Sequence, residues 1–79
     1  MLKLVITTKN LKWAEELREK AVKIFESHNL PFEVFQLSPA IQSKVPLLIK
    51  ANESILHKGA GLNKLQFEKI LRKYISRIQ

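Results

Sequence analysis

The sequence predicts an α/β domain in which a four-stranded mixed sheet packs against two main helices. Short apolar runs rich in β-branched residues alternate with longer segments in which apolar residues recur every three or four positions, and these two periods distinguish strands from helices. Asn, Gly and Pro stand at the boundaries between the segments. The hydrophobic fraction of 46% is ordinary for a globular protein and argues against disorder. From the length of 79 residues we expect one domain covering residues 1–79.

The first half of the chain predicts a strand, a helix and a second strand. Residues 2–7 are mostly apolar and end in β-branched side chains, as in a buried strand. Asn10 is a suitable N-cap for a helix over residues 11–28, which Asn29 terminates. Residues 32–37 predict the second strand, with apolar side chains on both of its faces. The apolar face of the helix consists of Ala14, Leu17, Ala21, Ile24 and Phe25.

The second half of the chain predicts two more strands and a final helix. Residues 38–44 form a short connection with at most one helical turn, and residues 45–50 and 54–58 are strands. Asn52 lies in the hairpin between these strands and is a candidate for a positive φ. Asn63 caps the last helix, which runs almost to the end of the sequence. A right-handed strand–helix–strand unit makes the first two strands parallel, and the short connections make the other two antiparallel.

Positive charge is concentrated in the second half of the chain. Fourteen Lys and Arg face seven acidic residues, which gives a formal charge of +7. Residues 1–39 carry six basic and five acidic groups, whereas residues 40–79 carry eight basic groups and two acids. Such a basic half suggests an anionic partner, most commonly nucleic acid, although a lysine-rich surface also serves solubility alone. The candidate anionic-partner patch consists of Lys58, Lys64, Lys69, Arg72, Lys73 and Arg77.

The order of these elements and several residue patterns resemble the thioredoxin and glutaredoxin family. Val45-Pro46 stands where that family has a hydrophobic residue followed by proline at the start of its third strand. Residues 59–71 resemble the family's glycine turn and last helix, and the run ITTKN at residues 6–10 resembles the start of a glutaredoxin. The resemblance implies a thioredoxin-like fold whose second helix is reduced to the connection at residues 38–44. It also implies a cis peptide bond between Val45 and Pro46.

The chain departs from that family at the residues that perform its chemistry. The two cysteines of the family's CxxC motif would fall near Lys12 and Glu15, and the chain contains no cysteine. Thiol–disulfide exchange requires a thiolate, so this chain cannot perform it. We expect no enzyme activity, no catalytic residue, no metal and no cofactor. A cysteine-free sequence without a signal peptide or a membrane-spanning run fits a cytoplasmic protein.

The region that corresponds to the family's substrate-facing surface supplies the candidate partner-binding residues. Trp13 is the only tryptophan, and it is either an anchor for a partner or a packing residue against the loop that contains Pro46. Lys9 resembles the glutaredoxin lysine that contacts glutathione, and with Lys12 it forms either a small anion site or a pair of solvated side chains. The complete candidate set is Lys9, Lys12, Trp13, Val45 and Pro46.

Three hypotheses for function follow from these features. The first is a redox-inactive, thioredoxin-like module that holds a protein or peptide partner, with the backbone of Val45 pairing to an extended segment. The second is a nucleic-acid-associated protein that contacts phosphates through the basic last helix. The third is a thiol-free glutathione-binding protein. We expect a monomer or a weak homodimer and no membrane partner.

Overall fold

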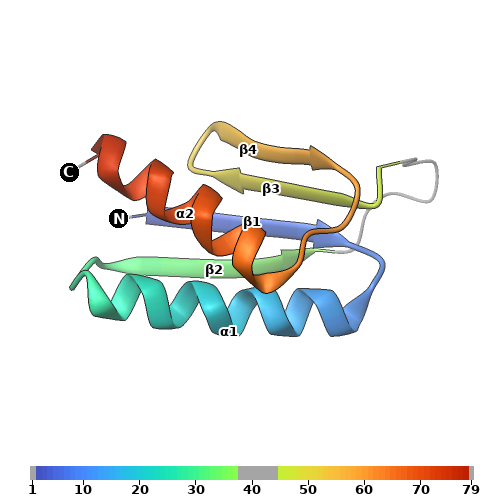
Figure 1. Ribbon diagram of the computed structural model, residues 1–79, viewed down its shortest axis with the longest axis horizontal. Coiled ribbons are helices and arrows are strands. Elements are labelled where there is room, and N and C mark those ends of the chain that lie inside the picture. The colour runs from blue at the N-terminus through green and yellow to red at the C-terminus, as the bar shows by residue number, and fades with distance from the viewer. Residues whose placement is uncertain (1, 38–44, 79) are drawn as a thin grey trace.

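The computed structural model describes residues 2–37 and 45–78, and it consists of one four-stranded sheet and two helices (Figure 1). Apolar runs form the strands, and the two segments with helical periodicity form the helices. In chain order the elements are β1 (Leu2–Thr8), α1 (Leu11–Ser27), β2 (Phe32–Leu37), β3 (Leu47–Ala51), β4 (Ser54–Gly59) and α2 (Lys64–Ile78).

The strands are ordered β2-β1-β3-β4 across the sheet. β1 and β2 are parallel, as a right-handed strand–helix–strand unit requires, and β1 with β3 and β3 with β4 are antiparallel. The predicted fold class, an α/β structure with a four-stranded mixed sheet and two main helices, is therefore confirmed. The connection at residues 38–44, where the family's second helix was expected to be reduced, lies outside the described residues.

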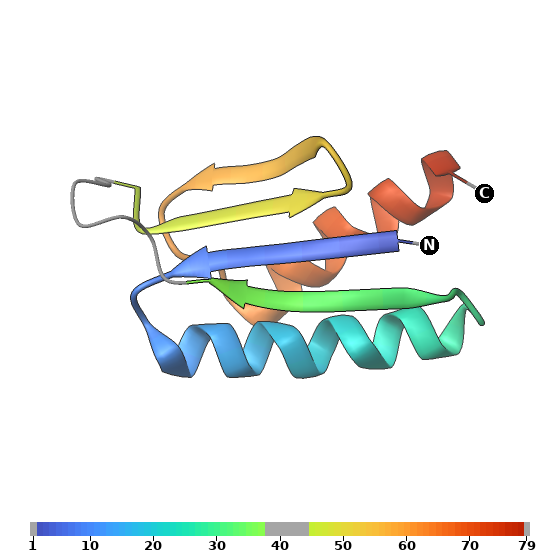
Figure 2. The ribbon, with the colours of Figure 1, turned by 180° about the vertical axis from the view of Figure 1, so that it is seen from behind.

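Both helices pack on one face of the sheet, and the core lies between them and the strands. Alternate residues of β1 point into this core, and Phe25 of α1 contacts Phe32 of β2 with ring centroids 5.2 Å apart. Figure 2 shows the sheet from behind, with no described helix crossing it. The largest fully buried side chains are Phe25, Phe67, Leu4, Ile6, Leu17, Leu47, Ile49, Leu71 and Ile75.

The second face of the sheet carries apolar and basic side chains together. The strand register places Lys50, Val5 and Phe35 in one row across three strands, and Leu48, Thr7 and Leu37 in the next row. Phe35 is 45% exposed, and Leu37 is 53% exposed. Within the described residues, this face is covered by no helix.

Asparagines fix the ends of the helices and the hairpin turn. Asn10 Oδ1 accepts a hydrogen bond from the Trp13 amide at 3.1 Å and caps α1. Asn63 and Gln66 form a reciprocal capping box at α2, with side-chain-to-amide distances of 2.8 and 3.1 Å. Asn29, after α1, and Asn52, in the β3–β4 turn, have φ values of 55° and 54°. These positions agree with the predicted helix starts, helix end and hairpin turn.

The peptide bond between Val45 and Pro46 is trans, so the expected cis bond is wrong. The described residues contain no cis peptide bond. The trans isomer of an X–Pro bond is favoured by about 0.5–1 kcal/mol unless its surroundings select the other isomer. In this trans form the Pro46 carbonyl accepts a hydrogen bond from Thr8 Oγ1 at 2.8 Å. β3 begins at Leu47 rather than at residue 45, and proline has no N–H to donate to a sheet.

Candidate partner-binding surfaces

The end of the sheet where β1 stops and β3 starts places the two segments that contain the five candidate partner-binding residues side by side. Thr8 pairs with Leu47 across the two strands, so the segment after β1 lies beside the segment before β3. The buried Thr8 hydroxyl joins them, because it donates to the Pro46 carbonyl and accepts from the Asn10 amide at 3.2 Å. We call this region the sheet-end surface, and its candidate residues are Lys9, Lys12, Trp13, Val45 and Pro46.

Trp13 is half-buried, and its indole ring packs over Gly61 in the connection between β4 and α2. A Cβ atom at residue 61 would lie 2.6 Å from Trp13 Cζ3 and 2.7 Å from Trp13 Cζ2. Glycine is therefore the residue that allows the ring to approach this closely. This contact favours the interpretation of Trp13 as a packing residue, with Gly61 as its neighbour.

Leu11 belongs to the same surface, although the sequence analysis did not single it out. It is the first residue of α1 and is 72% exposed, more than any other large hydrophobic residue described. The exposed side chains of Lys9 and Lys12 stand close to it in the sequence, and Pro46 is also exposed. The sequence carried a signal of this exposure, because Leu11 is not among the residues that form the apolar face of the helix. The sheet-end surface therefore combines exposed apolar side chains with two cations.

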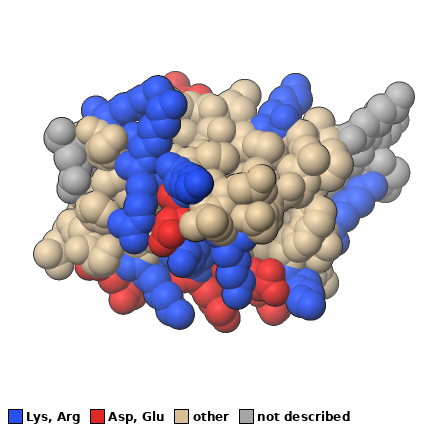
Figure 3. Space-filling model, viewed as in Figure 1, with Lys and Arg blue, Asp and Glu red and all other residues tan. Residues whose placement is uncertain are grey.

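More than half of the excess of positive charge is located on α2. This helix carries five basic residues and one acid, whereas α1 carries four of each. Lys69, Lys73 and Arg77 are exposed and follow one another at four-residue intervals, so they form a stripe along one side of α2. Figure 3 shows blue side chains gathered over α2 and mixed charges along α1. No ion pair involves the three members of this stripe within the described part of the chain.

Glu68 links α2 to α1 through Lys20 and pairs with Arg72 on its own helix. Its Oε1 atom lies 3.2 Å from Lys20 Nζ of α1 and 3.4 Å from Arg72 Nη2 one turn along α2. The hydrogen bond from Lys20, with the nearby charges of Lys20 and Arg72, holds the pKa of the Glu68 carboxyl below its usual range. Arg72 is therefore partly neutralised, and its Nη1 atom also lies 3.4 Å from His28 Nε2.

The remaining members of the predicted anionic-partner patch lie away from the stripe. Lys58 of β4 pairs with Leu48, which belongs to the row on the second face of the sheet. Residues directly opposite each other share a face, so Lys58 lies on the side of the sheet away from α2. Lys64 is the first residue of α2, and it lines a shallow hollow with Glu16 and Glu19 of α1. The uninterrupted part of the patch is therefore the stripe Lys69–Lys73–Arg77.

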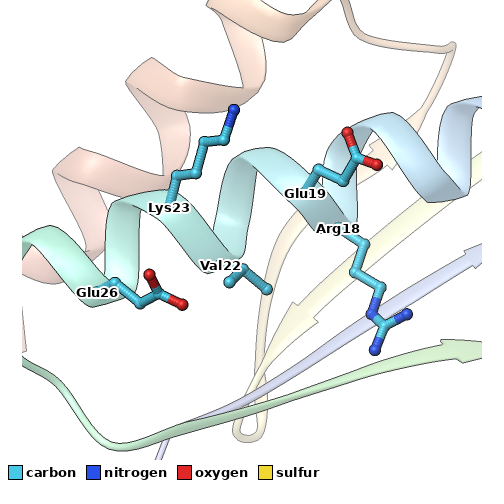
Figure 4. Close-up of a pocket in the computed structure, with 5 residues that line it drawn as sticks. All are labelled: Arg18, Glu19, Val22, Lys23 and Glu26. Carbon is cyan, nitrogen blue, oxygen red and sulfur yellow. The ribbon is translucent and has the colours of Figure 1, made fainter.

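Two surface hollows differ in the elements that line them. One has a volume of about 370 Å³, and the five side chains around it all come from α1 (Figure 4). With one helix as its only lining, it has no opposing wall to enclose a ligand. The other has a volume of about 230 Å³ and lies between β4 and α2, so two elements enclose it.

The described residues contain no group of three or more His, Cys, Asp or Glu side chains that is arranged to hold a metal ion. In the same residues, no helix combines the length and the apolar composition needed to cross a membrane. His57 Nε2 lies 2.6 Å from the Ala60 carbonyl and donates to it, which gives this histidine a structural role.

The four-stranded mixed sheet and the order of the elements along the chain agree with what the resemblance to thioredoxins and glutaredoxins implied, whereas the Val45–Pro46 bond does not. No protein-family model, no curated protein and no solved structure matches the chain. The fold is thus an α/β structure with a four-stranded mixed sheet, and membership of that family stays a prediction.

Proposed function

We propose that this protein is a redox-inactive binding module that holds a protein or peptide partner on its sheet-end surface. The observation that carries the proposal is the pairing of Thr8 with Leu47, which joins two segments that are distant in the sequence. Each segment contributes an exposed apolar side chain, Leu11 from one and Pro46 from the other. A reducing compartment suits a cysteine-free chain, so we place the protein in the cytoplasm.

Binding at this surface is non-covalent and uses side chains rather than strand pairing. The chain has no cysteine to form a mixed disulfide with a partner. The trans bond before Pro46 removes the support for backbone pairing at Val45 that the resemblance had suggested. Leu11 and Pro46 supply apolar contact area, and Lys9 and Lys12 attract acidic groups on the partner. Trp13 packs on Gly61, which leaves Leu11 and Pro46 as the exposed apolar side chains.

Selection of peptides from a random displayed library on the immobilised protein tests this proposal. The selected peptides should bind the wild-type protein and the Leu65→Lys control with equal affinity, because Leu65 is exposed at the start of α2. They should bind Leu11→Lys at least about tenfold more weakly, since an apolar contact is replaced by a charge. If the Leu11→Lys and Lys9→Glu variants both bind the selected peptides as tightly as the wild-type protein does, the sheet-end surface is not the site.

Nucleic-acid binding through α2 is the second candidate, and the unpaired stripe of Lys69, Lys73 and Arg77 favours it. The stripe runs from Lys69 to Arg77, about 12 Å of helix, and offers three phosphate contacts. Three such contacts give a slope of about −2 to −3 in a plot of log affinity against log salt concentration. Contacts to phosphates alone carry no information about the bases, so this binding is independent of nucleotide sequence.

Titration of fluorescein-labelled single- and double-stranded oligonucleotides, at low and at physiological salt, tests the second candidate. Lys73→Glu should lower the affinity and flatten the salt slope. Lys23→Glu is the matched control, because it makes the same charge change on α1, where charges are balanced. If Lys73→Glu and Lys23→Glu lower the affinity equally, or if the wild-type protein binds only at low salt, the binding reflects net charge and not a site on α2.

A further inference from the structure

The hollow between β4 and α2, which we call the β4–α2 hollow, is lined by both apolar and basic side chains. Ile55 and Leu56 of β4 and Ile70 of α2 provide the apolar surface. Lys73 and Arg77 provide two cations, and none of the lining residues is acidic. The full lining is Ile55, Leu56, Ile70, Lys73, Tyr74 and Arg77.

A β-bulge explains why two consecutive strand residues line the same hollow. Neighbouring side chains of a regular strand point to opposite faces of the sheet. In β4 the register shifts, since Ile49 pairs with His57 whereas Lys50 pairs with Ile55, which leaves Leu56 as the extra residue. Ile55 pairs with Lys50 of the second face, whereas Leu56 packs against the core, and next to the bulge both residues border the hollow at the edge of the sheet. Ile55 is 59% exposed there.

β4 is also an edge strand of the sheet. It pairs with β3 on one side, and within the described residues no strand pairs with its other side. The outward-facing N–H and C=O groups of an edge strand are a template for an added strand. A bulge discourages unspecific pairing at an edge, so an added strand gains most when its side chains also fit the neighbouring hollow.

We propose that the β4–α2 hollow binds an extended, acidic segment of a partner protein, which pairs with the outer edge of β4. Its apolar side chain contacts Ile55 and Leu56, and its carboxylates face Lys73 and Arg77. These two cations are one helical turn apart, about 6 Å along the axis, and alternate side chains of a strand repeat at about 6.7 Å. Two acidic residues separated by one position therefore match the two cations.

Tyr74 adds a polar contact at the base of this site. Its hydroxyl oxygen accepts a hydrogen bond from Asn52 Nδ2 at 3.4 Å. The hydroxyl proton is then available to donate to a carboxylate or a backbone carbonyl of the bound segment. This site is near the β3–β4 turn, whereas the sheet-end surface is at the other end of β3, so the two proposals are independent.

Fluorescence anisotropy with a labelled ten-residue probe peptide tests the inference. The probe carries Glu at two alternate positions and Ile at the next alternate position, and a matched probe carries Lys in place of each Glu. We expect the acidic probe to bind the wild-type protein and the basic probe not to bind. Lys73→Glu and Arg77→Glu should each weaken binding of the acidic probe about tenfold or more.

The decisive variant is Ile55→Lys, because it adds positive charge while removing an apolar contact. Leu65→Lys is its matched control, since the side chains of Ile55 and Leu65 are both 59% exposed and both substitutions add one positive charge. The proposal requires that Ile55→Lys lowers the affinity for the acidic probe and that Leu65→Lys does not. Tighter binding by Ile55→Lys would mean that net charge alone attracts the probe, and would overturn it.

Amide chemical shifts of the unmodified protein provide a readout that does not depend on any variant. Addition of the acidic probe should shift the amide signals of Ile55 and Leu56 along with those of α2 near Lys73. Shifts confined to α2 would refute the pairing with β4. Oligonucleotide binding is a separate outcome, because Ile55→Lys should leave it unchanged or strengthen it.

Discussion

Substitution of Gly61 by alanine measures how firmly Trp13 is packed. The new Cβ would lie 2.6 Å from Trp13 Cζ3, whereas an ordinary contact of this kind starts at 3.4 Å. Trp13 Cη2 would lie closer still, so the indole ring has to move by more than about 0.8 Å or rotate out of its site. Forced rearrangement in a packed region typically costs about 1–3 kcal/mol, which is the expected loss in free energy of unfolding.

Urea denaturation followed by fluorescence provides the assay, because Trp13 is the only tryptophan in the chain. The Gly61→Ala protein should unfold at lower urea concentration, and its native emission should shift to longer wavelength as the ring becomes more exposed. A Trp13→Leu background is the control, since the smaller side chain leaves room for the Cβ; because it lacks the fluorophore, all four proteins of the cycle are also unfolded in urea with far-UV circular dichroism as the signal. The penalty of Gly61→Ala should largely disappear there, as a double-mutant cycle detects.

Unchanged stability and unchanged emission in Gly61→Ala would refute the packing contact. Trp13 would then be free to contact a partner directly, and the packing role assigned to it at the sheet-end surface would be wrong. An equal penalty in the presence and absence of the indole ring would instead assign the cost to the backbone of the connection before α2.

Three further predictions concern single polar contacts. Thr8→Val leaves the Pro46 carbonyl and the Asn10 amide without their partner, and should lower the unfolding free energy by about 1–3 kcal/mol in urea titrations. Asn63→Ala removes one half of the capping box and should cost about 1 kcal/mol, with a loss of helical circular dichroism at lower temperature than in the wild type. The lowered pKa of Glu68 contributes stability above the usual carboxyl range, and this contribution is lost as the pH falls through the carboxyl pKa of the folded protein. Glu68→Gln should therefore show a smaller loss of stability than the wild type between about pH 7 and pH 3, and an identical loss would contradict the ion pairs with Lys20 and Arg72.

Local patterns in the sequence were sufficient to predict the secondary structure and much of the topology. The spacing of apolar residues identified both helices, and Asn10 and Asn63 cap them where the sequence placed caps. Asn52 has the positive φ expected of the hairpin. These features depend on the chemistry of a few neighbouring residues, so they can be derived without knowledge of the tertiary structure.

Features that depend on contacts between distant segments could not be derived in this way. The isomer of the Val45–Pro46 bond is decided by a difference of about 1 kcal/mol or less, which the tertiary surroundings set. The neighbour of Trp13 is Gly61, more than forty positions along the chain. The bulge at Leu56, and the face on which Lys58 lies, follow from the register of β4 on β3. The binding surfaces proposed above therefore differ in part from the residues that the sequence singled out.

The sheet face that no described helix covers has a consequence for the thermodynamics of unfolding. Heat capacity rises on unfolding mainly because buried apolar surface becomes hydrated, by about 1 kcal/mol/K for an average protein of this size. Phe35 and Leu37 already contact solvent in the native state, so they contribute little to that rise. A smaller heat-capacity change makes the unfolding enthalpy vary less with temperature. The stability curve of this protein is then flatter than that of a fold with both sheet faces covered, and its stability is retained over a wider range of temperature.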